Sequence, residues 1–285
     1  MWYLIGFATA AAVFFGVCLI VNAELFKSRV KCRSDELDGQ KVKFKSGKNT
    51  LEGRIWNNEG KKGVVVVSHG MGVDVKYYMP EIAAFAENGF KVFAYEYTGY
   101  GDSQGRFSGF FAAARDLKSA IDFVYDQNLP LILWGHSMGA YASAAVGQLT
   151  DKKISAIVCA AAFSSPKDAV KQLASADKKT GKMMQAAVFV SQLLLFGKNR
   201  NLQAADGIKK AKAPTLLLQG DSDDEVPPSG CSLYARRTDL PPYAKTILVS
   251  SAGSNGHMTV VRRRGEKCVN AETMAYVLDF LKEVL

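Results

Sequence analysis

LILWGHSMGAYASAAVGQL, residues 131–149, has the pattern of a strand, a tight turn and a helix in succession. The apolar run LILW predicts a buried strand, and the alanine-rich run after residue 138 predicts a helix. Between them Gly135-His136-Ser137-Met138-Gly139 matches Gly-x-Ser-x-Gly, a pattern typical of a turn that lifts a serine hydroxyl above a sheet. Such a turn strains the serine backbone and crowds its neighbours, so glycine is needed on both sides. Ser137 is therefore the candidate nucleophile of an α/β domain.

The alternation of strand and helix patterns extends through the rest of the chain. Apolar runs that predict strands lie at 63–68, 91–97, 131–134, 154–160, 215–218 and 246–250. Helix-like stretches lie at 80–88, 111–127, 138–149 and 270–285. Two earlier segments, 41–45 and 51–56, predict an antiparallel hairpin at the sheet edge. This order predicts a mostly parallel central sheet with helices on both faces.

Composition and charge exclude several classes of protein. Of the 285 residues 48% are hydrophobic, so the chain is neither disordered nor collagenous. Its five cysteines are scattered without any Cys-x-x-Cys pair, which argues against a disulfide framework and a zinc site. The net charge of +9 is concentrated in residues 27–48, with +5, and residues 164–212, with +7. Neither segment has the interleaved aromatic residues of a nucleic-acid-binding stripe, so a membrane surface is the better hypothesis.

A serine nucleophile needs a base and a carboxylate that orients the base. His257 follows the last predicted central strand, in a loop of small residues that can carry the imidazole back over the sheet. For the acid, Asp223 is preferred because of its position in the loop. It is the third residue after Gly220 and lies three residues before Val226-Pro227, the position at which this loop usually turns its carboxylate inward. Asp221 and Asp224 remain alternatives. The chain order of serine, acid and histidine agrees with this choice.

A second glycine-rich bend, Ser68-His69-Gly70-Met71-Gly72, follows the first central strand. Cleavage of an acyl bond develops negative charge on the carbonyl oxygen, and two backbone N–H groups are required to stabilise that charge. The N–H of Met138, directly after the nucleophile, and the N–H of Met71 in the bend are the predicted donors. A purely structural glycine turn is the alternative for Met71.

These motifs together resemble the α/β-hydrolase superfamily, particularly its monoacylglycerol lipase and serine aminopeptidase-like groups. The matching pieces cover about residues 40–285 and are SHGMG (68–72), YEYTGYGDSQG (95–105), GHSMG (135–139), QGDSDDEVP (219–227) and GSNGHM (253–258). The resemblance implies an α/β-hydrolase fold, a triad of Ser137, Asp223 and His257, oxyanion donors at Met71 and Met138, and no cofactor or metal. One departure is that Glu96 and Thr98 replace the usual aspartate and arginine of the second piece, so any ion pair there is altered.

The first 26 residues are predicted to form a transmembrane anchor. Residues 2–23 carry no charge, and as a helix they would extend about 33 Å, which matches a hydrocarbon core of about 30 Å. No basic residue precedes the apolar run, which disfavours the alternative of a cleaved signal peptide and secretion. The following basic linker, 27–40, places the catalytic domain in the cytoplasm by the positive-inside rule.

The domain at 41–285 contains an insertion at 164–212, too long for a simple crossover between strands. Its middle, 183–196, is uncharged and apolar and is flanked by lysines. Two interpretations are open for this helix, a lid over an apolar pocket and an ordinary buried crossover helix.

The leading functional hypothesis is a membrane-anchored serine hydrolase that cleaves an ester or thioester of an acyl lipid through an acyl-enzyme intermediate. The expected partners are a small-molecule acyl substrate and membrane lipids, with no nucleic acid. A peptidase or amidase of the same fold is the second hypothesis, because fold does not select among these bonds. A hydrolase-fold binding protein with an idle site is the third.

Overall fold

The computed structural model describes residues 2–28, 37–175, 178–251, 255–262 and 268–285. Most of the predicted basic linker, 27–40, lies outside these residues. The core is an eight-stranded sheet with the order β1-β2-β4-β3-β5-β6-β7-β8. Strand bounds are β1 Gln40–Ser46, β2 Asn49–Trp56, β3 Val64–Ser68, β4 Lys91–Tyr95, β5 Leu131–His136, β6 Ala156–Ala160, β7 Thr215–Gly220 and β8 Ala244–Val249. β1 and β2 form the predicted antiparallel edge hairpin, β2 is antiparallel to β4, and the other pairs are parallel.

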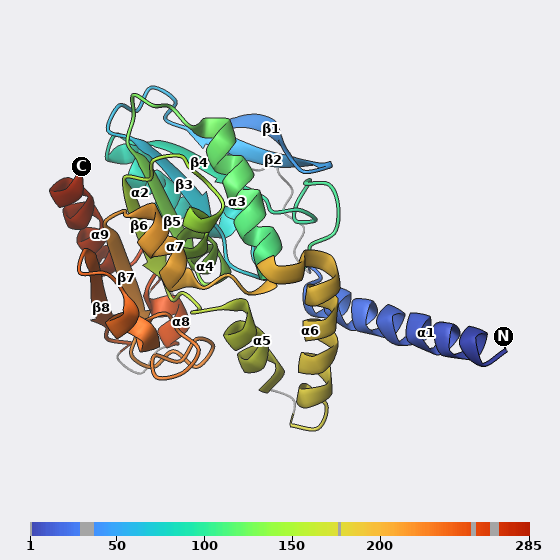
Figure 1. Ribbon diagram of the computed structural model, residues 1–285. Helices are drawn as coiled ribbons and strands as arrows, with labels where there is room; N and C mark the ends of the chain where they lie inside the picture. Colours follow the sequence, from blue (N-terminus) through green and yellow to red (C-terminus); the bar gives the residue numbers. More distant parts are fainter. Residues whose placement is uncertain (1, 29–36, 176–177, 252–254, 263–267) are drawn as a thin grey trace.

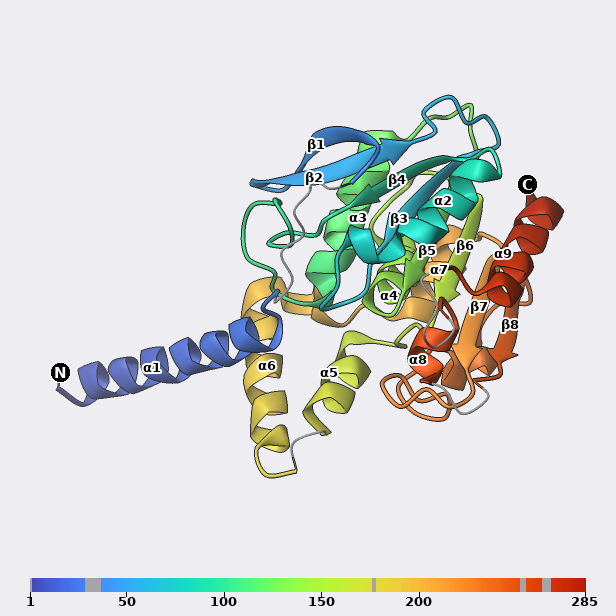
Figure 2. The same ribbon diagram turned by 180° about the vertical axis from the view of Figure 1, so that it is seen from behind.

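Helices cover both faces of the sheet, as predicted (Figures 1 and 2). The bounds are α1 Trp2–Leu25, α2 Met79–Glu87, α3 Phe110–Val124, α4 Met138–Ala145, α5 Pro166–Ser175, α6 Gly181–Phe196, α7 Ala204–Ala211, α8 Gly256–Thr259 and α9 Ala271–Val284, with short 3-10 segments η2 Val75–Tyr78, η3 Val146–Gln148, η4 Gly197–Asn201 and η5 Tyr234–Asp239. Side chains of β3 alternate between two cores. Val64 and Val66 pack with α3, α4 and α7, whereas Val65 and Val67 pack with α2 and α9. Burial on both faces explains the unbroken valine run of this strand.

The predicted insertion at 164–212 consists of two parts. Helices α5 and α6 form an arm that stands outside the sheet layers (Figure 1). Helix α7 packs against α4, so closely that a Cβ on Gly207 would lie 2.1 Å from the carbonyl oxygen of Ala144. The crossover helix of this segment is therefore α7. Helix α6 has only a narrow buried side, which includes Val188 and Gln192.

Helix α1 extends away from the domain and is held at its carboxyl end (Figures 1 and 2). Phe26 is 1% exposed and packs edge-on against Phe107 and Phe110. Residues Ile5–Leu25 form the one helix of the described chain that is long and apolar enough to cross a membrane. Its side chains are largely exposed, so the domain itself does not cover this apolar surface.

Candidate active site

Ser137 occupies the sharp turn between β5 and α4. Its φ of +55° is in the left-handed region, which costs free energy for a residue with a side chain, and its N–H donates to the carbonyl of Ala160 at 2.8 Å. A Cβ on Gly135 would lie 2.3 Å from the backbone of Gly139. A Cβ on Gly139 would lie 1.9 Å from the carbonyl oxygen of Ser68. Both glycines are thus required for the close approach that the pattern predicts.

His257 and Asp223 are joined by a hydrogen bond of 2.9 Å between Nδ1 and Oδ2. Asp223 is 3% exposed and also accepts from the Gln219 side chain at 3.0 Å and from the backbone N–H groups of Glu225 and Val226 at 3.0 and 2.7 Å. These three donors and the imidazole Nδ1 fix the direction of the buried carboxylate. The carboxylate can therefore hold the imidazole with its proton on Nδ1.

Two glycines allow the acid loop and the histidine loop to meet. A Cβ on Gly220 would lie 2.0 Å from the carbonyl oxygen of Gly256, and a Cβ on Gly256 would lie 2.3 Å from the backbone nitrogen of Asp223. The side chain of Asn255 caps α8 by accepting from the His257 N–H at 2.9 Å. Close backbone contact and this cap together place the imidazole over the carboxyl ends of the strands.

The alternative acids do not contact the imidazole Nδ1. Asp221 is exposed and accepts from the Ser251 N–H at 3.0 Å and from the Ser222 hydroxyl at 2.9 Å. These hydrogen bonds, led by those from Ser251, hold the pKa of Asp221 below its ordinary value. Asp224 is also exposed. Of the three aspartates, Asp223 alone has the geometry of an orienting acid.

The pKa of His257 is raised above its ordinary value. Burial of the ring acts in the opposite direction, but the hydrogen bond to Asp223 and the charges of Asp223, Glu225 and Asp224 outweigh it. Glu225 Oε2 lies 3.8 Å from Nε2, the ring atom opposite the Asp223 contact. The protonated ring is therefore stabilised on both sides.

A buried hydrogen-bond chain that sequence reasoning missed links the two glycine-rich turns to the histidine loop. Burial lowers the pKa of His136 to about 3, so this ring is neutral. Its Nε2 lies 3.0 Å from the carbonyl oxygen of His257, which only accepts, so Nε2 carries the proton. Nδ1 then accepts from the Tyr78 hydroxyl at 2.8 Å, and the Tyr78 oxygen accepts from the Gly70 N–H at 3.1 Å. No pattern near Tyr78 announces this contact, because only the fold brings η2 to β5.

The predicted oxyanion bend, 68–72, is held by a buried pair. His69 Nε2 and Glu96 Oε2 are 3.3 Å apart, and Glu96 Oε1 accepts from the Val75 N–H at 2.9 Å. Glu96 is the residue at which the sequence departs from the usual aspartate. Among the described residues, no backbone hydrogen bond is donated by Met71 or Met138. The N–H of Met71, a residue that lines the cavity described below, is thus without a backbone acceptor.

A cavity of about 370 Å³ contains Ser137, His257 and Met71 in its wall, within the size range of small-molecule sites. The remaining lining residues are Gly70, Val73, Tyr77, Tyr78, His136, Phe163, Gln172, Leu173, Asp224, Glu225 and Met258. No hydrogen bond joins Ser137 Oγ to His257 among the described residues. The geometry permits a serine nucleophile and an imidazole base to act on one ligand. In the part of the chain described, no group of three or more His, Cys, Asp and Glu side chains could hold a metal ion.

The sequence and the fold are each similar to those of known proteins. Residues 59–204 match the family model described as "Serine aminopeptidase, S33". A Schizosaccharomyces pombe protein that carries the name "Putative monoglyceride lipase" is 37% identical over 82 residues. That alignment covers 26% of this chain and 22% of the yeast protein, so it spans about a fifth of the relative's length.

Solved structures share the fold at low sequence identity. An esterase of Pyrococcus furiosus aligns with a TM-score of 0.64 and 19% identity, over 90% of this chain and 96% of that one. A proline iminopeptidase of Mycobacterium smegmatis aligns with a TM-score of 0.60 and 14% identity, over 86% and 98% of the two chains. At this identity the likeness establishes the fold and leaves the cleaved bond open.

Proposed function

Because this chain belongs to the serine aminopeptidase S33 family of α/β-hydrolases, we propose that it is a serine hydrolase that cleaves carboxylic ester or thioester bonds of acyl lipids. The observation that carries the proposal is the position of Ser137 at a strained turn, in one cavity with a histidine that a buried aspartate orients. That constellation is what acyl transfer to a serine needs.

In the proposed reaction Ser137 Oγ attacks the carbonyl carbon of the ester. His257 Nε2 takes the hydroxyl proton and then gives it to the departing alcohol, which leaves an acyl-enzyme. A water then loses a proton to His257 and attacks the acyl carbon, and the proton returns to Ser137 as the acid leaves. Asp223 stabilises the imidazolium through its bond to Nδ1. The N–H groups of Met71 and Met138 stabilise the oxyanion, at about 2.7–4 kcal/mol for each donor in comparable sites.

The apolar lining of the catalytic cavity supports an acyl substrate. Met71, Val73, Phe163, Leu173 and Met258 all face it. Burial of an acyl chain there is favourable by about 0.8 kcal/mol for each methylene.

A membrane source of substrate is part of the proposal. Helix α1 would span the bilayer through Ile5–Leu25, and the positive charge after it would place the domain on the cytoplasmic side. A signal sequence can have the same length and hydropathy as this helix, so these two properties do not distinguish an anchor from a signal sequence. Carbonate extraction of membranes that contain the full chain separates the two, since an integral anchor resists extraction.

One observation favours a second candidate function, an aminopeptidase. Asp224 and Glu225 are exposed carboxylates in the wall of the catalytic cavity, and such groups can bind the ammonium of an amino-terminal residue. The esterase proposal instead assigns Glu225 to the stabilisation of protonated His257.

A substrate panel tests the bond type. The full chain in detergent micelles is offered 4-nitrophenyl esters of two to sixteen carbons and 4-nitroanilides of alanine and proline. We expect kcat/KM to rise with acyl length and to exceed that for every anilide. A higher kcat/KM for an aminoacyl anilide than for any ester would replace the proposal with the aminopeptidase.

The pH dependence of activity tests the role of Glu225. His257 must be neutral to accept the Ser137 proton, so kcat/KM should rise as the pH passes upward through the raised pKa of His257. Glu225→Gln removes one carboxylate that raises this pKa, so the acidic limb should move to lower pH. The shift should shrink with added salt, because the Glu225 side chain is 60% exposed.

Asp224→Asn is the matched control for this profile. Asp224 is the weakest of the causes that raise the pKa of His257, so the control should shift the limb less than Glu225→Gln. Coincident profiles for wild type and Glu225→Gln at low salt would contradict the assignment.

A further inference from the structure

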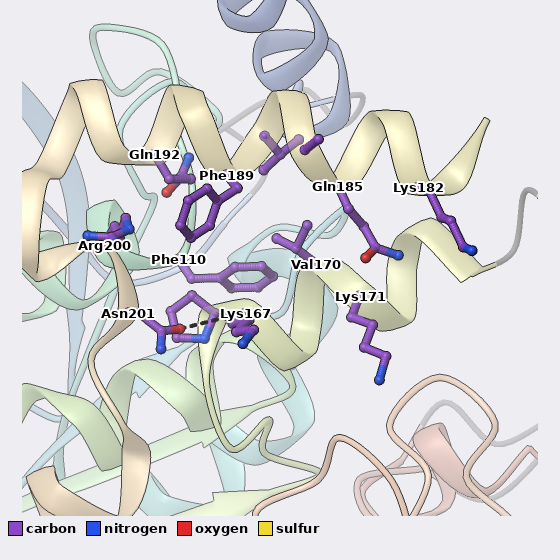
Figure 3. Close-up of a pocket in the computed structure, with 13 residues that line it drawn as sticks. Phe110, Lys167, Val170, Lys171, Lys182, Gln185, Phe189, Gln192, Arg200 and Asn201 are labelled. Atoms are coloured by element: carbon purple, nitrogen blue, oxygen red, sulfur yellow. Dashed lines mark hydrogen bonds between the residues drawn. The ribbon is translucent and has the colours of Figure 1, made fainter.

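A second cavity lies between helices α5 and α6, in the arm outside the sheet (Figure 3). Its volume is about 630 Å³, larger than that of the catalytic cavity. Phe110, Val170, Val188 and Phe189 contribute apolar side chains to this α5–α6 groove. Figure 3 shows Arg200 at one end of the groove and Lys182 at the other, with the two phenylalanine rings between them.

The α5–α6 groove is separate from the catalytic cavity. In the part of the chain that the structure describes, the two share no lining residue. Helix α5 forms the wall between them, with Val170 on the groove side and Leu173 on the catalytic side. The rings of Phe110, in the groove, and Phe163, in the catalytic cavity, pack with centroids 5.7 Å apart and complete the wall. An occupant of the groove would therefore not meet Ser137.

Charge around the groove has one sign. Lys167, Lys171, Lys182 and Arg200 line it, and among the described residues no carboxylate does. None of the three lysines is in an ion pair within the described part of the chain, and all three are exposed at the rim. Nε of Arg200 is buried and has no hydrogen-bond partner, although Nη1 donates to the Gly197 carbonyl at 2.8 Å. A site with an apolar floor, a cationic rim and an unsatisfied guanidinium N–H is complementary to an anionic amphiphile.

The groove adjoins helix α1. Gln192 lines the groove, and its Nε2 donates to Asn22 Oδ1 of α1 at 2.6 Å. Cys18, one turn earlier on α1, is also buried. Both α1 residues lie within Ile5–Leu25, the part long enough to cross a membrane. A bilayer that covers this span must therefore reach α6 and the end of the groove.

The outer face of α6 agrees with contact to lipid. Met183, Leu193 and Leu194 are each at least 45% exposed, and at their helical spacing they lie on one side of α6. An apolar patch exposed on the domain beside a helix that would span the bilayer is suited to contact with lipid. Within the described residues, the domain offers nothing else to cover this patch.

We propose that the α5–α6 groove binds one anionic phospholipid from the bilayer that holds α1. An acyl chain lies against Phe110, Val170 and Val188, and the phosphate lies between Lys171 and Lys182, at the end of the groove opposite Arg200. The proposal rests on the membrane placement of α1 in the proposed function, but it does not depend on the catalytic residues. A phosphate-bearing lipid is preferred to a fatty acid because four cations face the groove.

The test is native mass spectrometry of the full chain in detergent micelles, titrated with dioleoylphosphatidylglycerol or dioleoylphosphatidylcholine. We expect one phosphatidylglycerol retained for each chain, and weaker retention of phosphatidylcholine. Lys171→Glu with Lys182→Glu should weaken phosphatidylglycerol binding by about tenfold or more, given roughly 1 kcal/mol for each cation near a headgroup. Val170→Trp, which fills the groove and keeps the charges, should also weaken it.

Lys61→Glu with Lys62→Glu is the matched control, since these exposed lysines lie in the loop before β3. It should bind phosphatidylglycerol as wild type does. Three results would overturn the proposal. Wild type could retain both phospholipids equally, or the control could lose phosphatidylglycerol as strongly as the Lys171→Glu, Lys182→Glu protein. Oleate could also displace bound phosphatidylglycerol at a lower concentration than unlabelled phosphatidylglycerol does. Hydrolysis of a short soluble ester by the same samples reports the fold and the triad independently of lipid binding. An inactive wild type that binds phosphatidylglycerol would refute the proposed function alone.

Discussion

Ser137→Ala is expected to lower kcat for ester hydrolysis by a factor on the order of 10⁶, the loss that follows removal of a triad nucleophile in a comparable enzyme. The replacement removes the atom that forms the acyl-enzyme, while the alanine methyl retains the Cβ that the turn already accommodates. The positive φ of residue 137 is unchanged by the substitution. Loss of activity would therefore report chemistry and not loss of the fold.

Covalent labelling by a fluorophosphonate measures the same property without knowledge of the substrate. We expect the wild type to be labelled and Ser137→Ala and His257→Ala to remain unlabelled, because the probe reacts with a serine that a base has activated. Ser143→Ala is the matched control. Ser143 is fully buried on the same helix, and its hydroxyl has no hydrogen-bond partner, so its loss should leave labelling intact. Labelled Ser137→Ala protein would show that another nucleophile reacts.

Asp223→Asn is expected to lower kcat by about 10⁴, as the equivalent change does in serine proteases. The asparagine amide can donate to His257 Nδ1, which would move the ring proton to Nε2. A protonated Nε2 cannot accept the proton of the Ser137 hydroxyl. The N–H donors of Glu225 and Val226 still face the oxygen of the new side chain, so the loop should keep its shape. The measurement is kcat on a short ester, with thermal unfolding as the check on the fold.

Asp221→Asn and Asp224→Asn are the controls for that experiment. Asp221 accepts from the Ser251 N–H, away from the imidazole, and Asp224 is an exposed residue of the cavity wall. Each replacement should change kcat by only a few-fold. If Asp221→Asn or Asp224→Asn lowered kcat as much as Asp223→Asn or more, the orienting role would belong to the aspartate replaced in that variant.

The strands of the sheet and helices α2, α3, α4 and α9 were predictable because each carries a local signal, whereas α5, α7 and α8 were not predicted. The run GVVVVS could only be a strand buried on both faces, and the structure places Val64–Ser68 at the centre of the sheet. The pattern at 135–139 predicted the strained turn, since Gly135 and Gly139 have no room for a Cβ. Asp223 was the preferred acid by its place in the loop, and its contact with His257 agrees with that preference.

Other parts of the site had no local signal. The partners of Tyr78 and Glu96, which are His136 and His69, are distant in the sequence. The partner of Gln219 is Asp223, in a loop whose path the sequence does not reveal. The role of 183–196 was equally open, because an uncharged apolar helix suits a buried crossover and a lid over an apolar pocket alike.

The amino-acid sequence alone determined the α/β architecture and the apolar character of α1, and it predicts Ser137 as nucleophile and His257 as base, because each of these depends on residue type and spacing within one short segment. Only the tertiary structure decided which aspartate meets the imidazole, which tautomer His136 adopts, and that Gln192 joins the arm to Asn22 of α1. Those contacts form between segments 34, 121 and 170 residues apart. A hydrogen bond acts over about 3 Å, so it exists only once packing of the sheet and helices has brought such segments together.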